Sequence, residues 1–238
     1  MANIVEIFPS IQGEGLTLGV STLFIRFSGC NLRCSFCDTD YAYEPKEKCL
    51  LSREDKKTLE YLNPLTPEKL VEILRENYDF TYYPVLALTG GEPLLYASFL
   101  KEFLKKLAFP GEVLLETNGT LPEKLKEVIN FIDIVSQDYK IKPFVDQDLE
   151  GVHTEFLQIA HAKKAYVKLV VSPAVEEGEY EKVVNVLAHI DAKIPFILQP
   201  LSPINYDLEF ILAKQKKALK KLWDVRVIPQ VHKLLQVK

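Results

Sequence analysis

Two patterns of apolar residues alternate along most of the chain. Seven short runs of β-branched, aromatic and other apolar residues have the length and composition of buried strands. They lie at residues 21–27, 84–89, 112–117, 132–136, 165–172, 195–199 and 225–228. Between them stand longer segments in which apolar side chains recur at intervals of three and four, as on one face of a helix. This alternation predicts a mostly parallel sheet with helices outside it.

The clearest helical segment follows Thr66. Thr66 is a suitable N-cap, and Pro67 fits the first helical position because its missing N–H would have no helical partner there. An apolar stripe from Leu70 to Leu74 follows at helical spacing. A second stripe runs from Phe99 to Leu107, and further helices are expected near residues 122–130, 154–163, 177–190 and 207–222.

The length of the chain limits the architecture. At 238 residues it suits one substantial domain, residues 1–238. A closed barrel of eight strand–helix units needs about 250 residues. We therefore predict an α/β fold in the form of a partial (β/α) barrel, with ligands at the C-terminal ends of its strands. The charged, turn-rich segment from Tyr43 to Leu65 lacks the alternation, and we expect it to be an insertion or a lid with little sheet content.

Composition and charge narrow the class of protein. Hydrophobic residues make up 47% of the chain and charged residues 26%, as in an ordinary globular protein. The formal charge of −4 favours neither nucleic acid nor an anionic membrane as partner. No apolar run approaches the roughly 20 residues of a membrane span, and the first residues lack the basic start of a secretory signal. We therefore expect a cytoplasmic protein that binds neither nucleic acid nor a membrane.

Three of the four cysteines are crowded into one motif. Cys30, Cys34 and Cys37 form C-x3-C-x2-C directly after the first predicted strand. Three thiolates can hold three irons of a [4Fe–4S] cluster and leave the fourth iron open to a small molecule. The alternatives are a zinc site, which normally needs four ligands, or three buried free thiols. Cys49 is a candidate fourth ligand, but we expect it to be an ordinary thiol. Such thiols require a reducing compartment.

A glycine-rich motif follows the strand predicted at residues 84–89. It reads Thr-Gly-Gly-Glu-Pro at residues 89–93. Paired glycines at a strand end let the backbone approach a ligand closely, although alone they also fit a tight turn. Together with the cysteine spacing, the motif resembles the radical S-adenosylmethionine (SAM) superfamily. The resemblance implies a cluster on the three cysteines, with SAM bound or surrounded by Phe36, Gly90, Gly91, Glu92, Thr117, Asn118 and Ser136.

Polar groups suited to a heterocycle with a carboxylate gather near the N-terminus. Gln12 offers an amide, Glu14 an acceptor and Arg26 a guanidinium. Gly13 and Gly15 permit a sharp course of the backbone between them. These residues, with Glu-Thr-Asn-Gly at 116–119, Gln-Pro at 199–200 and Gln-x-His-Lys at 230–233, resemble the 7-carboxy-7-deazaguanine synthases over almost the whole chain.

That resemblance implies a carbon–nitrogen lyase of queuosine and deazapurine biosynthesis. Such an enzyme uses a 5′-deoxyadenosyl radical to convert 6-carboxy-5,6,7,8-tetrahydropterin to 7-carboxy-7-deazaguanine, with loss of ammonia and regeneration of SAM. It also implies Mg2+ on the substrate carboxylate with Thr39 as protein ligand, a reducing electron donor such as flavodoxin or ferredoxin, and a homodimer. The substrate residues that it implies are Gln12, Gly13, Glu14, Gly15, Arg26, Thr89 and His232.

One segment departs from the family pattern. The family usually reads Ser-Pro-Lys where this chain has Ser136-Gln137-Asp138-Tyr139-Lys140. An Asp-x-Lys there is similar to the activating enzymes of glycyl-radical proteins, which act on a protein partner. That activity is one alternative, and a non-catalytic zinc or iron–sulfur module is another. The first leaves the residues near the N-terminus unexplained, and the second leaves the motif at residues 89–93 without a purpose.

The remaining histidines are not assigned a chemical role. His153, His161 and His189 fall in or beside predicted helices, away from every motif. We expect all three to be structural or surface residues.

Overall fold

The computed structural model describes residues 1–237 and is organised around one ten-stranded sheet, in the order β10-β9-β8-β7-β6-β5-β2-β1-β3-β4. Neighbouring strands from β2 through β5 to β10 are parallel. These strands are β2 (Ser21–Phe27), β5 (Val85–Gly90), β6 (Glu112–Thr117), β7 (Ile134–Asp138), β8 (Lys164–Val171), β9 (Phe196–Pro200) and β10 (Val225–Val227). Because β10 and β4 are separate edges, the barrel is open, and the predicted partial (β/α) barrel is confirmed.

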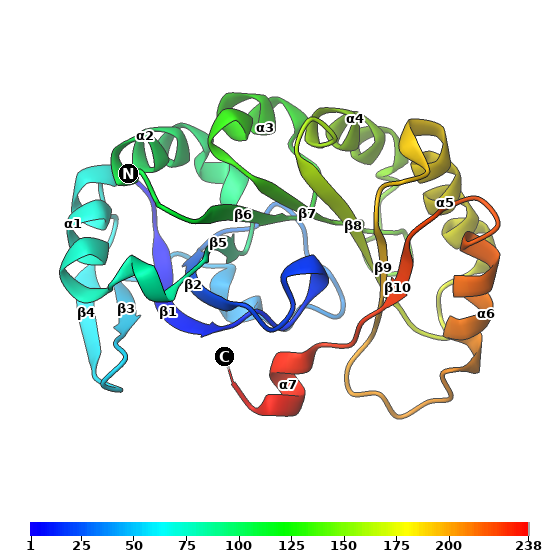
Figure 1. The fold of residues 1–238 in the computed structure, drawn as a ribbon, viewed down its shortest axis with the longest axis horizontal. Helices are drawn as coiled ribbons and strands as arrows, with labels where there is room; N and C mark the ends of the chain where they lie inside the picture. Colours follow the sequence, from blue (N-terminus) through cyan, green and yellow to red (C-terminus); the bar gives the residue numbers. More distant parts are fainter. Residues whose placement is uncertain (238) are drawn as a thin grey trace.

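Helices lie along the outside of the arched sheet (Figure 1). They are α1 (Pro67–Asn77), α2 (Ala97–Leu107), α3 (Pro122–Val128), α4 (Glu150–Ala160), α5 (Glu177–Asp191) and α6 (Glu209–Ala218). Thr66 caps α1 as predicted, since its side chain accepts a hydrogen bond from Lys69 N at 3.2 Å. Short 3-10 helices occur at Gly15–Thr17, Asp40–Ala42, Phe80–Tyr82, Pro93–Tyr96 and Ile129–Phe131. No helix within residues 1–237 is both long and apolar enough to cross a membrane.

Three strands were not predicted. β1 (Ile4–Ile11) pairs antiparallel with β2, and β3 (Lys48–Ser52) and β4 (Thr58–Leu62) form a hairpin that extends the sheet beyond β1. The expectation of little sheet content between Tyr43 and Leu65 is therefore wrong. The hairpin reads as polar because β4 is an edge strand, where charged side chains are tolerated. Lys48 and Glu60, for example, form an exposed cross-strand ion pair of 2.5 Å.

The buried apolar side chains form two clusters. The larger lies mainly between the sheet and the outer helices. The smaller fills the interior of the partial barrel with side chains from β1, β2 and β5 to β9, including Phe8, Phe24, Leu114, Tyr166 and Ile197. Phe8 and Phe24 stack there at 5.1 Å between ring centroids. The barrel therefore has a packed floor, and the polar residues near its strand ends are left to form a cavity.

Candidate active site

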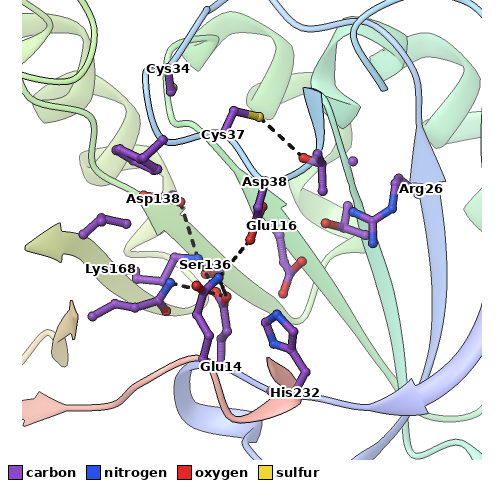
Figure 2. A pocket seen from close by; sticks show the side chains of 18 of the residues that line it. Glu14, Arg26, Cys34, Cys37, Asp38, Glu116, Ser136, Asp138, Lys168 and His232 are labelled. Carbon is purple, nitrogen blue, oxygen red and sulfur yellow. Dashed lines mark hydrogen bonds and ion pairs between the residues drawn. The ribbon is translucent and has the colours of Figure 1, made fainter. Parts of the chain in front are cut away.

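A cavity of about 890 Å³ lies within the open barrel (Figure 2). Its walls come from strand ends, from the loop after β2, and from the segment around the C-terminal helix α7 (Val231–Leu235). Every residue predicted for a site lines it except Gly15 and Glu92. The lining residues among those predicted are Gln12, Gly13, Glu14, Arg26, Cys30, Cys34, Phe36, Cys37, Thr39, Thr89, Gly90, Gly91, Thr117, Asn118, Ser136 and His232.

The three cysteines of the motif occupy the loop that follows β2. All three are free, half-buried and open to the cavity. Two backbone hydrogen bonds hold the loop: Gly29 N donates to Ala42 O at 2.7 Å, and Ser35 N donates to Phe144 O at 3.0 Å. Burial raises the pKa of Cys30, and it raises the pKa of Cys34 to about 11. Positive charge from bound iron would favour the thiolate forms that a cluster needs.

This donor set fits an iron–sulfur cluster with one open iron. Across residues 1–237, no three His, Cys, Asp or Glu side chains converge on a single metal position. In a cubane cluster each thiolate binds a different iron, so its cysteines need not converge on one point. Cys49 lies fully buried in the main core on β3, which agrees with its reading as an ordinary thiol.

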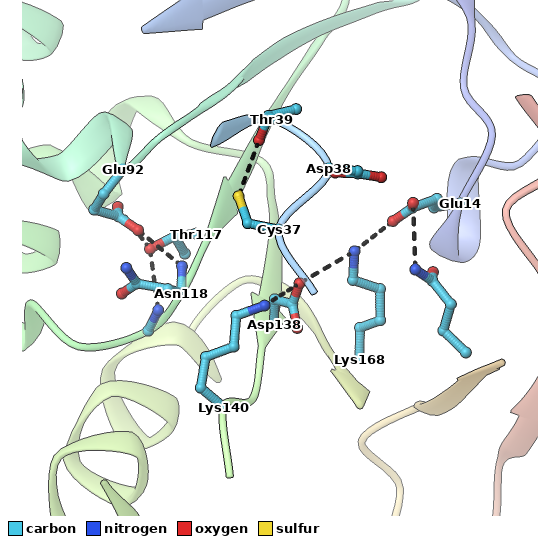
Figure 3. Close-up of polar contacts among 12 residues, drawn as sticks. Glu14, Cys37, Asp38, Thr39, Glu92, Thr117, Asn118, Asp138, Lys140 and Lys168 are labelled. Atoms are coloured by element: carbon cyan, nitrogen blue, oxygen red, sulfur yellow. Dashed lines mark hydrogen bonds and ion pairs between the residues drawn. The ribbon is translucent and has the colours of Figure 1, made fainter. Parts of the chain in front are cut away.

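Glu92 lies beside the cavity but does not line it. It is fully buried, and its carboxylate accepts hydrogen bonds from Leu94 N at 3.0 Å, Asn118 N at 2.8 Å and Thr117 Oγ1 at 2.8 Å (Figure 3). Burial raises the pKa of Glu92 to about 7, while these donors favour the ionised form. In this arrangement Glu92 connects the ends of β5 and β6.

Two glycines predicted to contact substrate act through close packing. At Gly15, φ is +65° and a Cβ would lie 2.1 Å from Tyr166 Oη, so the residue sits behind the cavity wall. At Gly13, a Cβ would lie 2.2 Å from His232 Nδ1. Val231 N also donates to Gly13 O at 3.0 Å. Gly13 thus allows α7 to bring His232 against the turn after β1.

Arg26 is held in a fixed orientation on β2. Its Nε donates to Glu6 Oε1 at 2.9 Å, and its guanidinium lies 5.4 Å from the ring centre of Phe8 and 6.0 Å from that of Tyr41. Tyr41 Oη donates to the same Glu6 oxygen at 3.1 Å. Since Nε makes the contact with Glu6, the terminal nitrogens remain for an anionic group in the cavity.

A network of charges that was not predicted from the sequence crosses the cavity. Lys168 on β8 pairs with Glu14 and lies 3.4 Å from Asp138 Oδ2, and Asp138 in turn pairs with Lys140 at 2.8 Å (Figure 3). Asp138 and Lys140, where the sequence differs from the usual family pattern, therefore both line the cavity and form an ion pair there. The available signal was a lysine inside an otherwise apolar strand run, because buried parallel strands are nearly continuously hydrophobic.

Two further carboxylates of the cavity also escaped prediction. Glu116 accepts a hydrogen bond from Gln12 Nε2 at 2.9 Å, and burial raises the pKa of Glu116. Asp38 pairs with Lys233 at 2.9 Å and accepts from Gln230 Nε2 at 3.1 Å. The two contacts of Asp38 join the segment around α7 to the cysteine loop.

His153 is structural, as expected, but it lies beside the motifs and not away from them. It is fully buried on α4, where its Nε2 accepts from Lys140 N at 3.2 Å and its Nδ1 lies 3.2 Å from Gly119 O. Its ring packs on Tyr139 at 4.2 Å. Because Nε2 accepts a hydrogen bond, the imidazole is neutral, and burial lowers the pKa of His153 to about 4.

We expect the chain to lose stability on acidification because of His153. Between its ordinary pKa near 6.5 and about 4, the unfolded chain binds a proton that the folded chain excludes. The free energy of unfolding should therefore fall by about 3 kcal/mol as the pH drops through this range. Urea unfolding of the cluster-free chain between pH 7 and pH 4 measures this loss. His153→Gln should flatten the profile and the exposed-site control His189→Gln should not; identical profiles for all three proteins would contradict the assignment.

Comparison with known proteins identifies the family. Residues 24–169 match the model of the radical SAM superfamily. The 7-carboxy-7-deazaguanine synthase of Methanopyrus kandleri is 38% identical, over 98% of this chain and 93% of that protein. The synthase of Geobacter sulfurreducens is 35% identical, over 98% of this chain and 97% of its own length. The crystal structure of QueE from Escherichia coli shares the fold, with a TM-score of 0.62 and 22% identity over 94% of this chain and 92% of that one.

The matches span the cysteine loop, the glycine-rich strand end and both halves of the cavity. They agree with the open barrel and with three cysteines at one end of its pocket. The chain belongs to the 7-carboxy-7-deazaguanine synthase family of the radical SAM superfamily.

Proposed function

We propose that this chain converts 6-carboxy-5,6,7,8-tetrahydropterin to 7-carboxy-7-deazaguanine with loss of ammonia. The observation that carries the proposal is one cavity with two chemically different parts. One part presents Cys30, Cys34 and Cys37, and the other presents a fixed guanidinium on Arg26 and a carboxylate on Glu14. Such a cavity can hold SAM and a small polar heterocycle side by side.

The cysteine part is suited to the cluster and SAM. When bound and reduced, the cluster and SAM supply the 5′-deoxyadenosyl radical that takes a hydrogen atom from the substrate. Cys30, Cys34 and Cys37 would hold the cluster. Glu92 would act indirectly, because its hydrogen bonds hold Thr117 and Asn118 in position. The residues that we assign to SAM and its surroundings are Phe36, Gly90, Gly91, Thr117, Asn118 and Ser136, all of which line the cavity.

The other part is suited to the pterin. Arg26 would pair with the 6-carboxylate, and Gln12 and Glu14 would meet the polar edge of the heterocycle, with Thr89 and His232 completing the wall. Thr39 is the proposed protein ligand of Mg2+ on the same carboxylate. Its Oγ1 lines the cavity 3.7 Å from Cys37 Sγ, and Mg2+ often takes few protein oxygens beside water and substrate.

A glycyl-radical activase is the less favoured function. Such an enzyme must admit a loop of a partner protein. Here Gln230 and Lys233 both bind Asp38, and so they tie the C-terminal segment to the cysteine loop across the cavity. That closure supports a small substrate.

Anaerobic turnover tests the proposed function. The chain is reconstituted with iron and sulfide, then given dithionite, SAM, the carboxy-tetrahydropterin and Mg2+. We expect the ultraviolet-absorbing deazaguanine to form without net consumption of SAM, and to form more slowly when Mg2+ is removed with a chelator. Cleavage of SAM with the pterin returned unchanged would overturn the substrate assignment and favour the activase.

We further propose that the chain works as a single domain in a reducing cytoplasm. One sheet runs through residues 4–227, and all four cysteines are free, which supports both points. A flavodoxin or ferredoxin would be the electron donor, and each can be tested in place of dithionite. The family resemblance suggests a homodimer, which sedimentation of the reconstituted protein would test.

A further inference from the structure

Lys168 is surrounded by acidic groups from three other parts of the chain. It projects from β8, and its side chain is 13% exposed. Its Nζ bonds Glu14, from the turn after β1, and lies 3.4 Å from Asp138 Oδ2, at the end of β7. Glu116, on β6, interacts with it electrostatically. A nearly buried ammonium needs such partners, because an unpaired buried charge is strongly destabilising.

Two carboxylates of the same cavity behave differently, and contact with Lys168 distinguishes them. Burial alone would raise the pKa of Glu14, but the paired Lys168 holds it below its usual value. Glu116 is bonded instead by the neutral amide of Gln12, and burial leaves the pKa of Glu116 raised. The contact with Lys168 therefore favours the ionised form of Glu14 at a depth where burial alone favours the neutral form.

The other contacts of Glu14 are consistent with an ionised group. Its Oε1 accepts from Gln230 Nε2 at 2.9 Å and from Gln199 Nε2 at 3.3 Å, and its Oε2 accepts from Lys168. Each of these partners is a donor. An ionised carboxylate accepts hydrogen bonds and donates none, whereas a protonated one also donates.

We propose that Lys168 is a positioning and specificity-determining residue, which holds Glu14 as an acceptor-only carboxylate so that the cavity selects a heterocycle presenting an amino group and a ring N–H. An analogue with oxygen in place of that amino group, a lumazine-type ring, would set its lone pairs against those of Glu14 and be rejected. This inference rests on the proposed function, because it concerns which ring the same cavity accepts.

Removing the charge of Lys168 should change the protonation of Glu14. Asp138 and Glu116 would then face Glu14 without the intervening cation. The other cations that line the cavity each have an acidic partner: Lys140 pairs with Asp138, Lys233 with Asp38 and Arg26 with Glu6. His232, against the turn that carries Glu14, completes the titratable groups on the α7 side. In Lys168→Met, the pKa of Glu14 would therefore rise, and the neutral form of its carboxyl group would be favoured until the pH is raised.

The kinetic test compares Lys168→Met with Lys168→Arg. We expect Lys168→Met to raise the KM for the pterin about 50-fold at pH 7, with the KM for SAM within about twofold of wild type. Preference for the 2-amino ring over its 2-oxo analogue should fall by about 10-fold or more. Both defects should shrink as the pH is raised, and Lys168→Arg should retain most of the preference.

Matched variants separate this role from loss of fold. Lys214→Met removes another nearly buried lysine, which lies on α6 outside the cavity and pairs with Glu177 of α5 at 3.0 Å. This variant should leave the preference unchanged. Glu14→Gln imitates a neutral Glu14 while keeping Lys168, and it should lose the preference at every pH. Retention of the preference in Lys168→Met or in Glu14→Gln would overturn the proposal.

An infrared difference spectrum tests the charge of Glu14 without turnover. Lys168→Met minus Lys168→Met/Glu14→Gln should show a protonated carboxylic acid, and wild type minus Glu14→Gln should show only a carboxylate. A carboxylate in both spectra would overturn the proposal. If the wild type makes no deazaguanine, the proposed function fails, and this measurement still decides whether Lys168 holds Glu14 ionised.

Discussion

Cys34→Ala is expected to abolish conversion of the pterin, with a loss of rate of at least about 1,000-fold, because the radical chemistry depends on a cluster held by three thiolates. Cys34 lies in a loop closed by backbone hydrogen bonds that do not involve its side chain, so the chain should still fold. Product formation, SAM cleavage, and bound iron and sulfide after anaerobic reconstitution are the measurements.

Cys49→Ala is the matched control for Cys34→Ala. It also removes a thiol, but from the apolar core on β3, so the cluster and the rate should survive. The expected cost is about 1 kcal/mol in the free energy of unfolding. A Cys34→Ala protein that turned over at the wild-type rate would refute the cluster mechanism, and a Cys49→Ala protein without cluster would require a fourth cysteine ligand.

Arg26→Gln is expected to lower kcat/KM for the pterin by about 100-fold, equivalent to about 3 kcal/mol. The amide can still donate a hydrogen bond, but it lacks the charge and the planar fork that suit a carboxylate. Arg26→Lys should lose less, because it keeps the charge. Initial rates over a range of pterin concentrations at saturating SAM measure these changes.

A substrate analogue tests whether the loss in Arg26→Gln comes from the carboxylate. A tetrahydropterin without the 6-carboxyl group should bind wild type and Arg26→Gln with the same weak affinity, measured by competition. Because Glu6 loses one partner in the variant while Tyr41 still donates to it, thermal unfolding should accompany the kinetics. If the variant weakened both ligands equally, Arg26 would be a structural residue and another group would bind the carboxylate.

The fold could be predicted wherever local pattern and tertiary environment agree. The strand at residues 21–27 is one example, because a continuous run of apolar residues indicates a strand that is buried on both faces. The start of α1 is another, because its capping residue Thr66 directly precedes the helix. The edge hairpin of β3 and β4 could not be predicted in this way. Its polar residues belong to a strand whose outer side faces no neighbour, and that position depends on the order of the whole sheet.

The candidate site also has one part that could be predicted from the sequence and one part that could not. Cys30, Cys34 and Cys37 stand within one loop, so their spacing alone determines that three thiols can share a cluster. The sequence also determined the parallel sheet and the family. Only the tertiary structure decided that Glu14 meets Lys168, 154 residues away, and Gln230, 216 residues away. The spacing of residues within one loop indicates which ligand they can bind together. The charge of a buried carboxylate depends instead on which distant groups the fold brings into contact with it.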